Sequence, residues 1–487
     1  MLFTEPAFLF LFLPILLGLY FLRGSREHAA YGNWLLLAAS VLFYAKGGGA
    51  FTWLMLGSIA FNYWMAISVD RAHGTPAAGR RLAFAVTVNL VVLGVFKYAN
   101  FFADNVNALL QLARVPPIAV PRVLLPIGIS FFTFHAISYV IDVSRRDATA
   151  QKSPVHAALY LLLFPQLIAG PIIRYRDIAG QLARRVVSID DFAEGVKRFV
   201  IGLGKKVLIA NIVGGPADKM FALPAAELST AHAWLGLVCY TLQIYFDFSG
   251  YSDMAIGLGR MFGFHFPENF RWPYVATSVT AFWRRWHISL STWFRDYLYI
   301  PLGGNRVGPA RRYLNLVSVF FLCGLWHGAS WNFVIWGLWH GTFLVIERLA
   351  AGIRNPQSAI RTDRGVFAWP IWPHVYTLLI VMIGWGFFRA ETLAGAVAFL
   401  ASLAGLNAAV VPTPYSVAWY LTPELWLALA AGALGSAPWL PAVAARIDER
   451  RSPGLALLNT AALMAVLVLS IMNLAASTYN PFIYFRF

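Results

Sequence analysis

The tetrapeptide Leu-Trp-His-Gly occurs twice, at 325–328 and 338–341, and places His327 and His340 in apolar sequence. A third histidine, His287, ends the polar and aromatic run Phe-Trp-Arg-Arg-Trp-His. An imidazole within a membrane is costly to bury unless it has a partner or a chemical task. A neutral imidazole is also the usual general base near pH 7. These three histidines are therefore the first candidates for a chemical site.

The composition predicts the class of protein that must position them. Of 487 residues, 59% are hydrophobic and 12% are charged, about half the charged share of a soluble domain. Apolar stretches of membrane-spanning length recur along the whole chain, so we expect an all-α integral membrane protein with roughly ten to twelve transmembrane helices. Thr4 and Glu5 replace the basic start of a signal peptide, so the first stretch is expected to be a permanent helix. The predicted spans are 7–22, 31–45, 51–69, 82–102, 124–142, 155–173, 232–250, 313–332, 333–350, 367–388, 425–444 and 455–474.

The net charge of +16 comes from basic residues that are spread over the loops. A positive-inside bias accounts for this pattern better than a nucleic-acid surface does. The odd-numbered loops are then cytoplasmic and the N-terminus lies outside. This alternation fails after residue 173, where the chain is basic again. Either 155–173 dips into the membrane and returns, or one predicted span is wrong.

The middle of the chain differs from a plain helical bundle. Residues 192–212 alternate charged and apolar side chains at helical spacing, which is typical of a helix at the cytoplasmic interface. Gly257, Gly259 and Gly263 interrupt the apolar pattern further on. We expect one membrane domain over 1–487, with interfacial and re-entrant helices in 174–312 and the catalytic core motifs in 279–341. No residues have the spacing of a metal site.

Several ordered motifs resemble the membrane-bound O-acyltransferase (MBOAT) family. They are the stretches 125–134, 164–171, 245–253, 282–291, 297–305, 325–332 and 481–487. Within that family the chain is most similar to the bacterial branch that contains the membrane subunit of alginate O-acetyltransferase. The resemblance implies a bacterial inner-membrane protein whose helices surround a central tunnel between a cytoplasmic donor site and an outer acceptor site. It also implies acyl transfer from a thioester to a hydroxyl, with His327 as the catalytic residue and His287 as the second histidine of the pattern.

The chemistry of the residues agrees with this role for His327. Transfer to an alcohol requires a base that removes the hydroxyl proton, and burial among Trp326, Trp331 and Trp336 would favour the neutral ring that a base requires. Flanking glycines leave room for a substrate chain. Asn332 could orient a ring or the substrate carbonyl, or could cap the helix that follows.

The second copy of the tetrapeptide tests this interpretation. On one straight helix, thirteen residues turn through about 1300°, so His340 would lie some 220° round from His327 and about 20 Å along the axis. If residues 330–332 instead form a turn between antiparallel helices, the two histidines approach each other again. We expect His340 to be a packing residue bonded to a neighbouring backbone, with a supporting role at most.

The aromatic and basic residues around His287 have two interpretations. Arg284, Arg285 and Arg295 could attract the phosphates of coenzyme A or of a carrier prosthetic group. Alternatively, they face lipid headgroups at the membrane surface. Trp283 and Trp326 belong to the same predicted channel.

Asp247 and Asp253 lie among aromatic residues near the end of a predicted span, where carboxylates need partners. We expect each to form an ion pair with an arginine of the basic interfacial helices. A role in orienting a histidine is the alternative.

These features predict an O-acyltransferase that moves an acetyl group from a cytoplasmic thioester, acetyl-CoA or an acyl carrier, and binds no cofactor of its own. The resemblance implies that periplasmic or membrane-anchored partner proteins complete the O-acetylation of an extracytoplasmic polysaccharide such as alginate. The same chemistry would serve cellulose, peptidoglycan, or D-alanyl transfer to teichoic acid. A transporter that uses intramembrane histidines as a proton relay is an alternative, but the sequence lacks the inverted repeats that would favour it. A scaffold of an export complex is a third possibility.

Overall fold

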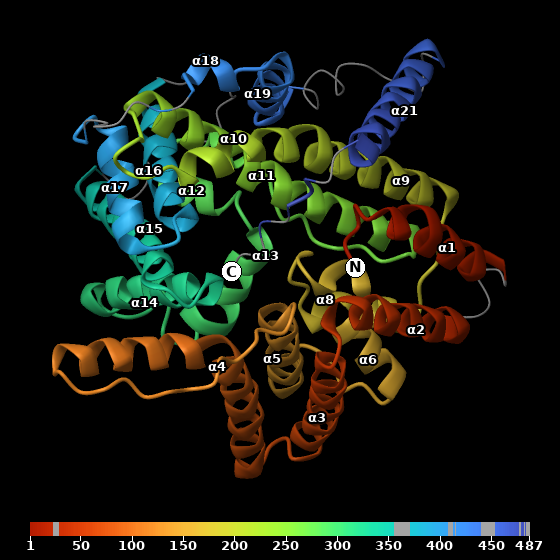
Figure 1. The fold of residues 1–487 in the computed structure, drawn as a ribbon. Helices are drawn as coiled ribbons and strands as arrows, with labels where there is room; N and C mark the ends of the chain where they lie inside the picture. The colour runs from red at the N-terminus through yellow and green to blue at the C-terminus, as the bar shows by residue number, and fades with distance from the viewer. Residues whose placement is uncertain are drawn as a thin grey trace. The chain divides into compact units, whose positions relative to one another are not determined.

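The computed structural model describes residues 1–22, 29–354, 371–407, 413, 415–439, 453–476, 479–481 and 483. These residues form helices joined by turns and extended segments, with no strand among them (Figure 1). The predicted all-α class is confirmed. The chain divides into two compact units, Met1–Phe199 with Tyr251–Pro267 and Val200–Gly250 with Glu268–Phe487. That they form one membrane domain stays a prediction.

The first unit contains the N-terminal helices. Its elements are η1 (Phe8–Phe12), α1 (Leu13–Leu22), α2 (Ala29–Gly48), α3 (Phe51–Arg71), α4 (Pro76–Leu112), α5 (Ile129–Arg145), α6 (Pro154–Leu162), α7 (Phe164–Leu167), α8 (Tyr175–Ala183), most of α9 (Ile189–Gly204) and the end of α11 (Thr230–Met261). Helices α3, α4 and α5 pack on one another. Asn62 of α3 and Asn89 of α4 exchange side-chain hydrogen bonds of 2.8 and 3.1 Å, so neither buried amide lacks a partner.

The second unit contains all three histidines of the predicted site. Its elements are η2 (Lys205–Ala210), α10 (Asn211–Ala222), the first part of α11, η3 (Pro273–Val275), α12 (Val279–Trp283), α13 (Ile288–Phe294), η4 (Arg295–Tyr299), α14 (Pro309–His327), α15 (Trp331–Arg354), α16 (Ile371–Arg389), α17 (Leu393–Leu403), α18 (Val417–Tyr420), α19 (Pro423–Gly435) and α21 (Pro453–Ala476).

Within the described residues, six helices are long and apolar enough to cross a membrane. They are Phe51–Arg71, Pro76–Leu112, Ile189–Ala222, Trp331–Ala350, Ile371–Arg389 and Gly454–Ala476. Shorter apolar helices lie at Phe8–Leu22, Leu393–Leu403 and Pro423–Gly435. The larger count of ten to twelve spans stays a prediction. The basic first loop and the ends of two predicted spans, 367–370 and 440–444, lie outside the described residues.

The structure changes the prediction for residues 155–173, the segment before the alternation of basic loops fails. The predicted span 155–173 is not one helix, because α6 ends after nine residues and α7 has only four. Leu163 between them has φ −52° and ψ 113°, a backbone conformation outside the helical region that interrupts the helix. The remaining residues up to Ile173 are buried and not helical. A continuous crossing at this point was therefore the wrong prediction, and the dipping alternative agrees with the broken helix.

Two segments in the middle of the chain are continuous helices. Residues 192–212 belong to the 34-residue helical run Ile189–Ala222, which is itself long and apolar enough to cross, so an interfacial position for them stays a prediction. Gly257 does not break its helix, because α11 continues to Met261. A Cβ at Gly257 would lie 2.6 Å from the carbonyl oxygen of Gly195. This glycine therefore permits a close approach of two helices inside the first unit.

Helices α14 and α15 run in opposite directions and approach each other closely. A Cβ at Gly324 would overlap the carbonyl oxygen of Phe333, and a Cβ at Gly337 would overlap that of Phe320. Further along the same contact, Gly341 faces Phe320. Backbones at this distance leave room for glycine alone. The turn at 328–330 thus connects two antiparallel helices. Of the two arrangements considered for His340, one straight helix or a turn between antiparallel helices, the structure has the second.

We predict that Gly337→Ala lowers the stability of the detergent-solubilised protein by about 1–3 kcal/mol, because the added methyl group forces the two backbones apart. Thermal unfolding measures the effect. Gly215→Ala is the matched control, since Gly215 is also helical and a Cβ there meets nothing within 4 Å. Equal losses in both variants would contradict a role for the α14–α15 contact.

Candidate active site

His327 is the last residue of α14, and its side chain is 6% exposed. The helix ends at Gly328, whose backbone is extended, with φ −165° and ψ 149°. The ring of Phe333 occupies the space where a Cβ of Gly328 would lie, so the position requires glycine. The imidazole packs against Trp336 and Phe388 with ring centroids 5.0 and 5.2 Å apart. The end of a helix thus presents His327 to aromatic rings from α15 and α16.

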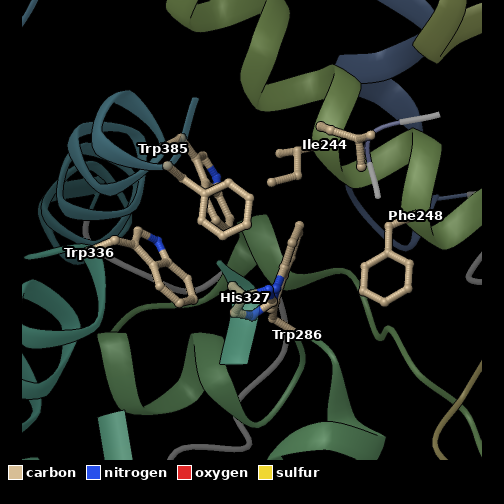
Figure 2. Close-up of a pocket in the computed structure, with 8 residues that line it drawn as sticks. Ile244, Phe248, Trp286, His327, Trp336 and Trp385 are labelled. Atoms are coloured by element: carbon tan, nitrogen blue, oxygen red, sulfur yellow. The ribbon is translucent and has the colours of Figure 1, made fainter. Parts of the chain in front are cut away.

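A small, partly open cavity lies beside this imidazole. Figure 2 shows Trp336 and Trp385 on one side of His327 and Ile244 and Phe248 on the other. The complete lining is Ile244, Phe248, Trp286, His327, Trp336, Trp385, Phe388 and Ile483. His327 is its one ionisable member, and the other side chains are apolar or aromatic.

His287 is 1% exposed and precedes α13 in a left-handed conformation, with φ 44° and ψ 54°. A positive φ is uncommon for any residue except glycine and is often found at functional sites. The ring centroids of His287 and His327 are 6.5 Å apart. Phe248, which lines the cavity, contacts the His287 ring at 4.6 Å. The two histidines that the resemblance assigns to the site therefore lie close together in the second unit.

Asn269 determines which nitrogen of His287 carries the proton. Its Oδ1 accepts hydrogen bonds from the backbone N–H and the hydroxyl of Ser289, at 3.3 and 2.9 Å. Because this atom acts as an acceptor, His287 Nδ1 at 3.1 Å is the donor. In the neutral ring Nε2 then keeps its lone pair, and it has no hydrogen-bond partner among the described residues. This nitrogen can accept a hydrogen bond from a substrate.

His340 packs behind the site and outside the cavity lining. Its fully buried ring contacts Trp283 and Trp336, with centroids 5.1 and 5.4 Å apart. Trp336 thus contacts both histidines of the repeated tetrapeptide. Neither ring nitrogen of His340 has a hydrogen-bond partner in the described part of the chain, so the predicted bond to a neighbouring backbone is wrong. The tight aromatic packing, with Gly384 against Nε2, leaves no carbonyl within reach.

Two other predicted residues, Trp331 and Asn332, lie differently from expectation. Trp331 is 52% exposed, and Phe388 packs against the ring of His327 instead. Asn332 donates to the carbonyl oxygen of Ala390 at 2.5 Å, so it joins the start of α15 to the end of α16 and does not orient a histidine. Trp326 lies beside both His327 and His287, with ring centroids 4.9 and 6.1 Å apart, and its role in a channel stays a prediction.

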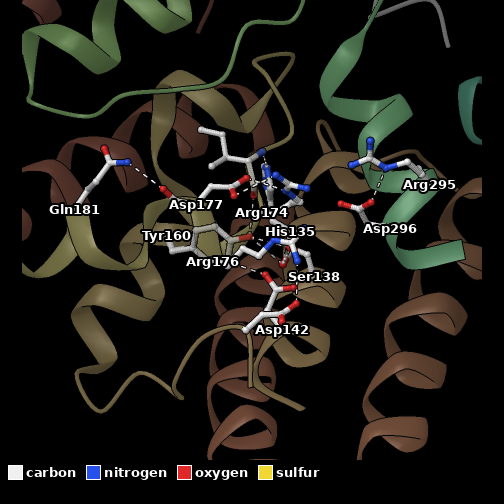
Figure 3. Close-up of polar contacts among 12 residues, drawn as sticks. His135, Ser138, Asp142, Tyr160, Arg174, Arg176, Asp177, Gln181, Arg295 and Asp296 are labelled. Carbon is white, nitrogen blue, oxygen red and sulfur yellow. Dashed lines mark hydrogen bonds and ion pairs between the residues drawn. The ribbon is translucent and has the colours of Figure 1, made fainter. Parts of the chain in front are cut away.

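The three arginines near His287 lie outside the cavity lining. Arg284 is exposed. Arg285 donates to the carbonyl oxygen of Arg271 at 3.2 Å. Arg295 pairs with Asp296 at 2.7 Å, as Figure 3 shows. Their exposure is compatible both with phosphates and with lipid headgroups, and both roles stay predictions.

The two carboxylates of α11 form ion pairs, as predicted. Asp253 pairs with Arg198 at 2.7 Å. The partner of Asp247 is Lys206, also at 2.7 Å, and not an arginine. Both side chains of this second pair are 2% exposed. The amphipathic pattern that predicted a basic partner could not distinguish Lys206 from the arginines near it.

Sequence reasoning missed Glu347, which holds the element that carries Trp283. Its carboxylate accepts from the backbone N–H groups of Val279 and Thr280 and from the Thr280 hydroxyl, at 2.6 to 2.9 Å. An anion at a helix N-terminus satisfies N–H groups that have no partner within the helix. A lone acidic residue in the apolar stretch of α15 was the signal that could have revealed it.

The first unit holds a separate polar cluster around His135 (Figure 3). His135 Nε2 accepts from the backbone N–H of Ile173 at 3.2 Å, and the Tyr160 hydroxyl donates to the carbonyl oxygen of Ile173 at 2.9 Å. Asp142 accepts from the backbone N–H of Arg176 at 3.1 Å. These bonds hold the non-helical segment after α7, so we interpret the cluster as structural. No group of possible metal ligands occurs among the described residues.

The described residues form helices, several of them of membrane length, and two buried histidines lie close together, one of them in the wall of an apolar cavity. The model of the MBOAT, membrane-bound O-acyltransferase family, matches residues 86–387. This chain belongs to that family, and it is a multi-pass membrane O-acyltransferase.

Its relatives include O-acetylating proteins of bacteria. It is 45% identical over 515 residues to the probable alginate O-acetylase AlgI of Azotobacter vinelandii, covering 100% of both chains. It is 49% identical over 394 residues to the probable alginate O-acetylase AlgI of Pseudomonas syringae, covering 81% of this chain and 73% of that one. It is 37% identical over 437 residues to the peptidoglycan O-acetyltransferase of Helicobacter pylori, covering 84% and 80%.

We predict that Asn269→Leu destabilises the protein by about 1–3 kcal/mol, because it leaves buried donors of His287 and Ser289 without an acceptor. Thermal unfolding in detergent measures the loss. Asn305→Leu is the control: it also removes an amide acceptor, from the Tyr299 hydroxyl, but at an exposed position. A shift of the same size in the control would show that Asn269 has no special role.

Proposed function

We propose that the protein takes an acetyl group from a thioester, acetyl-CoA, and transfers it to a hydroxyl during the O-acetylation of an extracytoplasmic polysaccharide such as alginate. The observation that carries this proposal is His327 in the wall of an otherwise apolar cavity, with the ring of His287 6.5 Å away. Relatives whose names specify alginate O-acetylation support the choice of acyl group and polymer. The bacterial inner membrane is the proposed location, because a cytoplasmic donor and an outer polymer meet there.

In the proposed reaction, His327 is the general base. The acceptor hydroxyl transfers its proton to the imidazole as its oxygen bonds to the thioester carbonyl carbon. The tetrahedral intermediate then collapses, the C–S bond breaks, and the thiolate takes the proton from the imidazolium. The products are an ester and a free thiol. His287 accepts a hydrogen bond at Nε2 from a second O–H or N–H group of the acceptor and so orients it.

The route of the substrates follows from the same arrangement. The exposed Arg284 and the basic residues near it attract the phosphates of the donor on the cytoplasmic side. Periplasmic or membrane-anchored partner proteins take the acetyl group onward, and the acceptor at His327 is a hydroxyl of such a partner or of the sugar.

Peptidoglycan is the second candidate polymer. The relative from Helicobacter pylori, a peptidoglycan O-acetyltransferase that matches 84% of this chain, favours it. The chemistry at His327 is the same for both polymers.

We expect His327→Leu to lower acetyl transfer by the purified protein by about 10²–10⁴-fold, the usual contribution of a general base. The measurement is release of thiol from acetyl-CoA together with acetyl capture by a soluble polysaccharide acceptor. His340→Leu is the matched control, because His340 occupies the same tetrapeptide but lies outside the cavity lining, and it should retain activity within about threefold of wild type, a change of under 1 kcal/mol in the barrier. Undiminished transfer by folded His327→Leu would disprove the assignment.

A further inference from the structure

The pair of Lys206 and Asp247 is buried in the second unit, with both side chains 2% exposed and the charged atoms 2.7 Å apart. A buried ion pair loses the solvation of both charges, and it is stable only if further hydrogen bonds satisfy the two ions. Asn211 supplies one such bond, since its Oδ1 accepts from Lys206 Nζ at 2.8 Å. The others come from a distant part of the chain.

Both ions bind the backbone of the segment Tyr479–Ile483, of which residues 479–481 and 483 are described. Lys206 Nζ donates to the carbonyl oxygen of Pro481. Asp247 Oδ2 accepts from the backbone N–H of Ile483 at 2.8 Å. The ion pair therefore works as a clamp on this segment.

Two further bonds hold the start of the same segment. Asn211 Nδ2 donates to Asn480 Oδ1 at 3.2 Å. The Tyr479 hydroxyl donates to Asp218 at 2.7 Å, and Asp218 pairs with Arg389 at 2.7 Å. Anchors from η2, α10 and α11 thus hold the backbone on both sides of Pro481.

The clamp places one side chain in the wall of the active-site cavity. Ile483 is 3% exposed and lines the cavity that contains His327. Ile244 and Phe248 are four residues apart on one face of α11 and both line the cavity, and Asp247 is a neighbour of Ile244 three residues further along the helix. Ile483 is therefore held against the wall that α11 contributes.

We propose that Ile483 determines the length of the acyl group that the enzyme transfers. This inference rests on the proposed function. The reaction is the one written above: an ester C–O bond forms, the thioester C–S bond breaks, and the thiol leaves with the proton. The acyl chain that occupies the cavity during this step competes for space with the Ile483 side chain, so a short chain such as acetyl is accepted and longer chains are excluded.

The test compares acyl transfer from acetyl-CoA, propionyl-CoA and butyryl-CoA by full-length purified variants. Ile483→Ala removes three carbon atoms from the wall and should raise the butyryl-to-acetyl transfer ratio by about tenfold or more, because one or two methylene groups in an apolar pocket discriminate by about that factor. Ile483→Val should give an intermediate ratio. Ile380→Ala is the matched control, because Ile380 is similarly buried, 5% exposed, and does not line the cavity.

A second variant tests the clamp. The double change Lys206→Met with Asp247→Leu removes both charges at once, so neither is left buried without its partner. It releases the backbone of Pro481 and Ile483 and should raise the same ratio while acetyl transfer persists.

The outcomes separate this inference from the proposed function. Acetyl transfer by Ile483→Ala at an unchanged butyryl-to-acetyl ratio overturns the inference, as does an equal rise in Ile380→Ala. Loss of transfer from every donor in folded Ile483→Val also overturns it. If wild type transfers no acyl group from any of the three donors, the proposed function itself has failed.

Discussion

The glycine-lined contact between α14 and α15 is the constraint on which the site depends. Gly324 and Gly337 lie where each helix meets a carbonyl oxygen of the other, so the two backbones pack at a distance that no side chain allows. This approach brings Trp336 of α15 against His327 at the end of α14. His340, four residues after Trp336 on the same helix, contacts the same indole. His327 and its aromatic wall are thus positioned by the close approach of the two backbones.

The absence of unpaired charges at the cavity is a second feature of the described part of the site. None of the lining side chains is a carboxylate or a fixed cation. The nearby acidic residues have structural partners: Asp247 binds Lys206 and the C-terminal segment, while Glu347 caps α12. In an apolar environment, a charge without a partner carries a large desolvation cost. The site therefore combines a buried imidazole with carbon walls, which suits a neutral base and an uncharged acyl group.

Part of this arrangement could be predicted from residue types. Helices of membrane length follow from hydropathy, and carboxylates among aromatic residues must find basic partners. Asp253 was expected to pair with an arginine and does so, with Arg198. Asp247 pairs with Lys206, a basic residue but not the predicted arginine. Trp331 was expected to bury His327 because it is near in sequence, but Phe388, sixty-one residues further along, packs there. Proximity in sequence was misleading because the turn at 328–330 lies between the two residues and leaves Trp331 half exposed.

The sequence alone determined the membrane class, the family and the choice of His327 and His287 as candidate residues, since these follow from composition and from motifs that are local in the chain. The tertiary structure decided that the repeated tetrapeptide has two unlike environments, with His327 in a cavity wall and His340 in a closed aromatic packing. It also decided that Ile483, 156 residues beyond His327, forms part of the same wall. These results depend on which backbones approach closely and which buried charges pair. Such contacts join residues far apart in the chain, and no local pattern encodes them.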